Sequence, residues 1–116
     1  MNHKDLNVWK KSMDLAVLIY DLTNAFPNDE RFGLTSQMRR AAVSIPSNIA
    51  EGAARKSDKE FLQFLSIALG SLSELETQYI LAIRINIIES NDVVDHSLID
   101  VKKLILGFRN YLKKKE

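Results

Sequence analysis

The sequence of 116 residues contains no cysteine, which excludes a disulfide framework, a thiolate nucleophile and a thiolate metal site. Glycine and proline are scarce, with four and two residues, so an all-β fold with many tight turns is disfavoured. The apolar runs are far shorter than the ~20 residues that a membrane-spanning helix needs, and no signal-peptide core follows the start. These absences predict a cytoplasmic protein without a membrane partner.

An excess of charge of one sign is also lacking. The chain has 16 Lys and Arg residues against 15 Asp and Glu residues, a net charge of +1. Bulk charge therefore does not indicate nucleic-acid binding, which requires that basic residues cluster in the fold. The hydrophobic content of 46% and charged content of 27% are typical of one ordinary globular domain.

Apolar residues recur with helical spacing in four segments, at about 6–26, 34–55, 58–88 and 92–113. Short segments rich in helix-stopping residues separate them. Four amphipathic helices with short connections predict a single all-α domain over residues 1–116, an antiparallel up-down-up-down four-helix bundle. The apolar arcs of the first and third helices are wider than one small bundle interior needs. We therefore expect a homo-oligomer.

Two helix starts carry capping signals. Thr35 or Ser36 is the candidate N-cap of the second helix, since hydroxyl side chains accept hydrogen bonds from first-turn amides. Ser57 and Glu60 have the spacing of a capping box, which predicts the start of the third helix.

The stretch SIPSNIAEG, residues 44–52, places polar and helix-disrupting residues inside the second helical pattern. Pro46 has no N–H and its ring crowds the carbonyl of Ala42. The chain therefore either bends as one helix or starts a new one at the proline. The unbroken apolar spacing from 34 to 53 favours one kinked helix.

We interpret this stretch as a structural polar cluster rather than a catalytic Ser/Asn/Glu site, because no histidine base is near it in the sequence. The hydroxyls of Ser44 and Ser47 are expected to return to carbonyls one turn back. Gly52 is expected to let another backbone approach. The structural residues are predicted to be Pro46, Ser47, Asn48, Glu51 and Gly52.

Basic residues gather where the starts of the first and third helices would meet the ends of the second and fourth. The candidate nucleic-acid contacts at that end are Lys10, Lys11, Arg55, Lys56, Lys59, Arg109, Lys113, Lys114 and Lys115. Arg39 and Arg40 form a second candidate patch, although one of them could instead pair with an acid across a subunit contact. Cations at helix ends also complement the helix dipoles without any ligand.

Other sites are disfavoured. Asp92, His96 and Asp100 share a helix face at four-residue spacing, but such a set is more typical of solvated pairs than of a metal site. The Glu-x-x-His motif of di-iron bundles is absent because position 93 is valine. The sequence therefore predicts no catalytic residue, no metal and no cofactor, and a protein that is not an enzyme.

Three stretches carry a family resemblance: DLNVWKKSMDLA at 5–16, LTSQMRRAAVSIPSNIAEGAAR at 34–55 and ALGSLSELET at 68–77. They resemble the 23S rRNA-intervening-sequence protein family, whose members are encoded within inserts of bacterial 23S rRNA genes or stand alone. The resemblance implies a four-helix bundle, often a ring-like homopentamer, with no established enzymatic activity. A related branch, the accessory variability determinant proteins of diversity-generating retroelements, looks like basic pentamers that bind RNA and reverse transcriptase. The implied partners are therefore RNA or DNA, or else a protein such as a ribosomal component or a reverse transcriptase.

Overall fold

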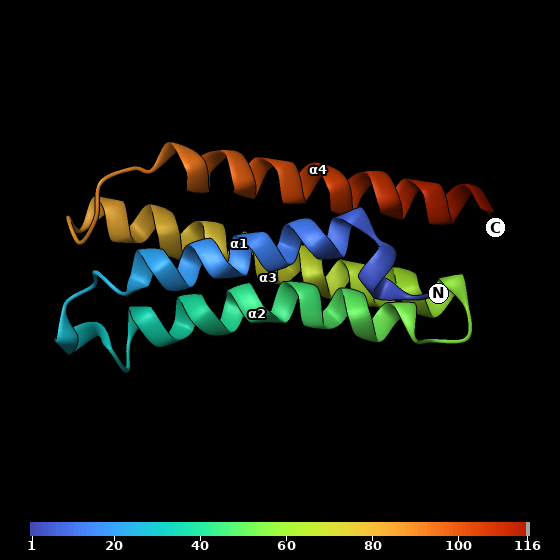
Figure 1. The fold of residues 1–116 in the computed structure, drawn as a ribbon, viewed down its shortest axis with the longest axis horizontal. Helices are drawn as coiled ribbons and strands as arrows, with labels where there is room; N and C mark the ends of the chain where they lie inside the picture. Colours follow the sequence, from blue (N-terminus) through green and yellow to red (C-terminus); the bar gives the residue numbers. More distant parts are fainter. Residues whose placement is uncertain (116) are drawn as a thin grey trace.

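The computed structural model describes residues 1–115 and contains four long helices (Figure 1). They are α1 (Asn7–Thr23), α2 (Leu34–Ala53), α3 (Asp58–Arg84) and α4 (Asp92–Lys115), with the short 3-10 helices η1 (His3–Asp5) and η2 (Asn28–Glu30). Each long helix packs against the next along the chain, and α4 packs against α1. This closes the antiparallel four-helix bundle that the sequence predicts.

One apolar core runs along the bundle. Each helix supplies large side chains that are fully buried: Leu15, Ile19, Ile45, Ile49, Leu65, Leu75, Ile105 and Leu112. Burying a side chain of this size contributes about 1.5–3 kcal/mol, so these positions dominate the stability of the fold. None of the helices within residues 1–115 is both long enough and apolar enough to cross a membrane.

The start of α2 differs from the prediction. Gly33 is the N-cap, and neither Thr35 nor Ser36 caps the helix. Instead the Leu34 amide donates to Glu30 Oε1 at 3.1 Å. The turn at η2 brings the Glu30 side chain to the start of α2. Glycine suits position 33, because an added Cβ there would lie 3.0 Å from Glu30 Oε1. The Glu30 carboxylate also complements the positive end of the helix dipole.

The end of α3 also differs, because the helix stops at Arg84 rather than near residue 88. Asn86 has a φ of 64°, in the left-handed region that asparagine tolerates better than most residues. The Ile87 amide donates to Ala82 O at 2.9 Å and the Asn86 amide to Ile83 O at 3.1 Å. This is the hydrogen-bond pattern of a Schellman motif, which ends a helix by satisfying its last carbonyls.

A polar network fixes the connection between α3 and α4. The buried Tyr79 hydroxyl donates to Asp95 Oδ1 at 2.8 Å and accepts from the Asn91 amide at 2.8 Å. Asn91 Oδ1 in turn accepts from the Val94 amide at 3.1 Å, which caps α4. Burial raises the pKa of Tyr79 above its ordinary value of 10.0, and the hydrogen bond to the Asp95 carboxylate raises it further.

Candidate functional site

The stretch 44–52 lies within α2, which continues through Pro46 as a single helix. Gly52 faces α3 at very short range. A Cβ at this position would lie 2.6 Å from Phe61 Cδ1 and 2.8 Å from Phe64 Cβ. The atoms that approach Gly52 belong to the side chains of Phe61 and Phe64 on α3, rather than to the backbone that the sequence led us to expect.

The polar side chains of this stretch join α2 to α3. Ser44 Oγ lies 2.8 Å from Ser71 Oγ on α3, and either hydroxyl can be the donor. Asn48 Nδ2 donates to Ser44 O at 2.8 Å and to Ser44 Oγ at 3.0 Å. The expectation that the Ser44 hydroxyl bonds a carbonyl of its own helix is wrong, because the Ser71 hydroxyl of α3 lies within hydrogen-bond distance. We call this contact, with Gly52 at one end, the α2–α3 seam.

The remaining residues of the stretch lie outside the seam. Ser47 is exposed on the other side of α2, where it lines a groove beside α1 rather than bonding within a buried cluster. Glu51 is exposed and pairs with Arg55 at 3.2 Å, one turn along the helix. The polar cluster is thus smaller than predicted, and it has the geometry of a helix-to-helix contact.

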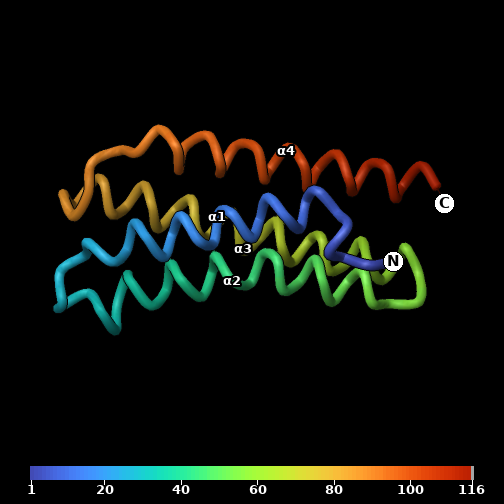
Figure 2. Tube along the Cα trace, in the orientation of Figure 1, coloured from blue at the N-terminus to red at the C-terminus, as the bar shows by residue number. Residues whose placement is uncertain are grey.

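The basic end of the bundle comprises the start of α1, the end of α2, the start of α3 and the end of α4. Figure 2 shows both chain termini and the α2–α3 connection at this end. Two of its predicted contacts are engaged within the chain. Arg55 pairs with Glu51 and lies 4.8 Å from the ring centre of Phe64, and Lys115 pairs with Asp58 at 3.6 Å.

Most of the other predicted contacts at this end are exposed. Within residues 1–115, no carboxylate lies within 4 Å of their ammonium groups, which belong to Lys10, Lys11, Lys56, Lys59, Lys113 and Lys114. Lys11 lines a groove between α1 and α4 together with Asp14 and Asp100, so it faces the side of the bundle. Arg109 is half-buried, and its Nε has no hydrogen-bond partner among the described residues.

Arg39 and Arg40 lie toward the opposite end and differ in role. Arg39 Nε donates to Thr23 Oγ1 at 2.8 Å, and its Nη2 donates to Asn24 Oδ1 at 2.9 Å. Its guanidinium also lies 4.6 Å from the ring centre of Tyr20. Arg39 therefore clamps the start of α2 to the end of α1. Arg40 is exposed, and no carboxylate of residues 1–115 lies within 4 Å of its guanidinium.

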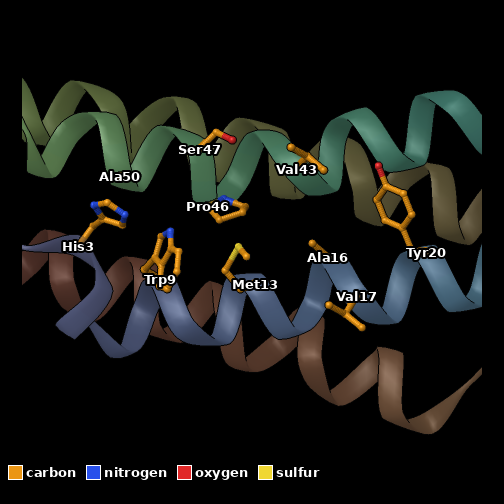
Figure 3. A pocket seen from close by; sticks show the side chains of 10 residues that line it. All are labelled: His3, Trp9, Met13, Ala16, Val17, Tyr20, Val43, Pro46, Ser47 and Ala50. Atoms are coloured by element: carbon orange, nitrogen blue, oxygen red, sulfur yellow. The ribbon is translucent and has the colours of Figure 1, made fainter.

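An open apolar groove of about 500 Å³ separates the outer faces of α1 and α2. Figure 3 shows Trp9 and Met13 extending from α1 toward Pro46 on α2. Farther along the groove, Val17 and Val43 are 58% and 42% exposed. We call this feature the α1–α2 groove. The sequence predicts surplus apolar surface on the first helix, but it does not predict that α2 contributes to the same groove. Val43 and Pro46 are three residues apart, a spacing that the core residues of α2 also show, so the pattern does not mark them as groove residues.

Surplus apolar surface also occurs on α3, as predicted. Ile67, Ile80 and Leu81 are each about half exposed. They do not form one continuous surface, because Glu74 and Gln78 lie between Ile67 and Leu81 on their helix face, and Ile80 borders a hollow with Ile99 of α4.

Comparison with known proteins adds the family. The family model described as 23S rRNA-intervening sequence protein matches residues 4–106. The chain belongs to this family. A similar solved structure is that of a protein of unknown function from the S23 ribosomal protein family of Bacteroides thetaiotaomicron VPI-5482. It has a TM-score of 0.80 and 28% sequence identity, covering 88% of this chain and 97% of that one.

The comparisons place the chain in a family without assigning it a reaction. No curated protein matches the chain. The similar solved structure is itself described as having unknown function. The surfaces of the bundle are therefore the evidence for its function.

Proposed function

We propose that the protein is a non-enzymatic, homo-oligomeric bundle that binds RNA or DNA through its basic end. The supporting observation is the set of exposed lysines at that end with no carboxylate within 4 Å among residues 1–115. Lys59 lies in the first turn of α3, and Lys113 and Lys114 lie in the last turn of α4. Two nearby acids, Glu51 and Asp58, are already paired with Arg55 and Lys115, so they offset less of this charge.

Such a surface suits phosphate backbones rather than particular bases. Lysine ammonium groups on flexible stems act as point charges, and neutralising phosphates releases condensed counterions. Contacts of this kind position a nucleic acid but carry no direct sequence information. In an oligomer whose subunits point the same way, the basic ends lie together and their charge adds.

The homo-oligomer in this proposal rests on the α1–α2 groove and on the exposed aliphatic side chains of α3. The groove is concave, the side chains of α3 project from a helix, and both belong to the same chain. A groove of one copy that receives exposed aliphatic side chains of the next makes a head-to-tail contact, and such contacts generate rings when the rotation closes. The homopentamer implied by the family resemblance is one such ring.

A gel shift with a labelled rRNA fragment tests the nucleic-acid proposal. We expect retention that weakens steeply as salt increases, because the contacts are electrostatic. The variant Lys113→Gln/Lys114→Gln should bind more weakly and lower the salt slope by about 2, roughly one unit per lost phosphate contact.

The matched control is Lys102→Gln/Lys103→Gln, which removes the same charge from exposed positions farther back on α4. It should leave binding close to that of the unmodified protein. Equal weakening by both variants, or no retention even at low salt, would show that the basic end does not bind nucleic acid.

A protein–protein scaffold is the second candidate function, favoured by the size and apolar lining of the α1–α2 groove. In that case the groove docks another protein, such as a ribosomal component or a reverse transcriptase. A pull-down that persists after nuclease treatment and fails when the groove carries Val17→Glu/Val43→Glu supports this alternative. A pull-down that nuclease abolishes supports the nucleic-acid proposal.

A further inference from the structure

A second pocket lies beyond the end of the α1–α2 groove, where α1 connects to α2, and has a volume of about 560 Å³. Arg31, Arg39 and Arg40 line it, together with the aromatic rings of Tyr20 and Phe32. Within residues 1–115, no carboxylate lies within 4 Å of any of the three guanidinium groups. Three cationic side chains therefore line one hollow without an ion-pair partner among residues 1–115. We call it the arginine pocket.

The side chains of this pocket are partly held in place before any ligand arrives. Hydrogen bonds to Thr23 and Asn24 fix the Arg39 guanidinium. The first turn of α2 also borders the pocket at Thr35 and Ser36, while the Glu30 carboxylate already occupies the positive end of that helix. Guanidinium groups bind phosphate oxygens in paired hydrogen bonds, so this arrangement favours a phosphate over a simple halide.

Phe32 indicates that the ligand is more than a phosphate. Its side chain is 88% exposed, although an aromatic ring of this size ordinarily packs against apolar neighbours. The Arg31 guanidinium lies 5.3 Å from the centre of its ring. A ring exposed beside a cation is a platform on which nucleic-acid bases stack, in a way that tolerates any base.

The surrounding charge limits how much nucleic acid can enter. The end of the bundle that holds the arginine pocket also carries Asp21, Asp29, Glu89 and Asp92, all exposed. An extended duplex lying across this end would bring many phosphates close to these carboxylates, and the repulsion opposes it. A single nucleotide unit needs only the arginines and the exposed ring.

We propose that the arginine pocket binds one unpaired nucleotide, with its phosphate on Arg31, Arg39 and Arg40 and its base stacked on Phe32. The ligand is either a free nucleotide or an unpaired residue of a nucleic-acid strand, and the chemistry recognised is the same. This site is separate from the basic end, and it goes beyond the function proposed above.

Calorimetry on the full chain tests the site with adenosine monophosphate, adenosine and inorganic phosphate as probes. Adenosine monophosphate should bind about tenfold more tightly than either of the others, because stacking and phosphate pairing each contribute. Phe32→Ala and Arg40→Gln should each weaken its binding by a similar factor. Both side chains are exposed, so neither substitution removes core packing.

Arg84→Gln is the matched control, because Arg84 is an exposed arginine at the end of α3, on the same end of the bundle but outside the pocket. It should leave nucleotide binding unchanged. Lys113→Gln/Lys114→Gln should also leave it unchanged, which separates this site from the basic end. Equal weakening by Arg40→Gln and Arg84→Gln overturns the proposal, as does phosphate binding as tightly as adenosine monophosphate.

Competition identifies the source of the nucleotide. Single-stranded RNA is tested as a competitor of bound adenosine monophosphate, with its concentration counted per nucleotide. If the RNA displaces the probe at a lower concentration than free adenosine monophosphate does, the site binds an unpaired residue of a strand. If it displaces the probe less well, the site binds the free nucleotide. Equal displacement by a duplex overturns the site as argued. Light scattering on Arg40→Gln tests the alternative that Arg40 is a contact between subunits. A loss of oligomer mass with unchanged nucleotide binding would make Arg40 a subunit contact and overturn the proposal.

Discussion

The two sides of α2 meet their neighbouring helices in opposite ways. Toward α3 the helix presents Gly52 and Ser44, and the Phe61 side chain lies so close that even a methyl group at Gly52 would overlap its ring. Toward α1 it presents Val43 and Pro46, which border an open groove of about 500 Å³. One helix thus has a closed contact and an open one within the same few turns.

This difference supports the proposal that the open side docks a second copy. Small and hydroxyl side chains let α3 complete the contact within the chain, so the α2–α3 seam leaves nothing for a partner. Along the α1–α2 groove the same chain leaves apolar atoms in water, and burying them would contribute about 25 cal/mol per Å². A face that its own fold does not cover is the natural place for a second copy to dock.

Charge placed in the groove should produce the largest effect. Val17→Glu/Val43→Glu is expected to convert the assembly to monomers, because two carboxylates would be buried without partners at the contact between copies. Light scattering measures the mass, and circular dichroism checks that the helices persist. Val93→Glu, at a similarly exposed position on α4, is the control and should leave the mass unchanged. A monomeric unmodified protein at micromolar concentration would contradict the homo-oligomer.

A methyl group added to the α2–α3 seam should cost the next largest amount. Gly52→Ala is expected to lower the free energy of unfolding by about 1–3 kcal/mol, the usual effect of overpacking. Gly70→Ala is the control, since Gly70 lies within α3 and no atom approaches within 4 Å of its added Cβ. The control should stabilise the protein by about 0.5–1 kcal/mol, because alanine favours helix. Urea unfolding measures both, and equal values would mean that the seam is not tight.

The polar contact in the seam should matter less. Ser44→Ala and Ser71→Ala are each expected to lower the free energy of unfolding by about 1 kcal/mol, the net value of a typical hydrogen bond. The double variant should cost less than the sum of the two, because each single change already breaks the same contact. Strict additivity in the cycle would show that the two hydroxyls do not interact.

Tyr79 extends the comparison to the contact between α3 and α4, where the smallest expected effect is a change in how stability depends on pH. Its pKa is higher in the folded than in the unfolded protein, so its contribution to stability is complete below about pH 10 and is lost as pH rises through the folded pKa. Tyr79→Phe should therefore lose less stability between about pH 8 and about pH 11 than the unmodified protein. Urea unfolding at both pH values measures this, and parallel losses would contradict it.

Much of the fold follows from the sequence, whereas the site follows from it only in part. Helical spacing identified all four helices, because burying an apolar stripe is a local requirement of every bundle. The helix ends were less predictable: Glu30 caps α2 only because η2 folds it back, and Asn86 ends α3 through a conformation that its neighbours allow. The charge clusters were visible in the sequence, but the pairing of Arg55 and Lys115 was not.

By itself, the sequence determined the all-α class, the four amphipathic helices, the family and the gathering of basic residues toward one end. Spacing and composition determine the fold class and the helices because they act within a few residues, whereas the family follows from three particular stretches and the match over residues 4–106. Only the tertiary structure decided which sides of α2 are closed and open, that Arg39 is a clamp while Arg40 is exposed, and that Phe32 stands beside the arginines. These properties depend on contacts between segments that are distant in the chain, so the local sequence pattern does not determine them.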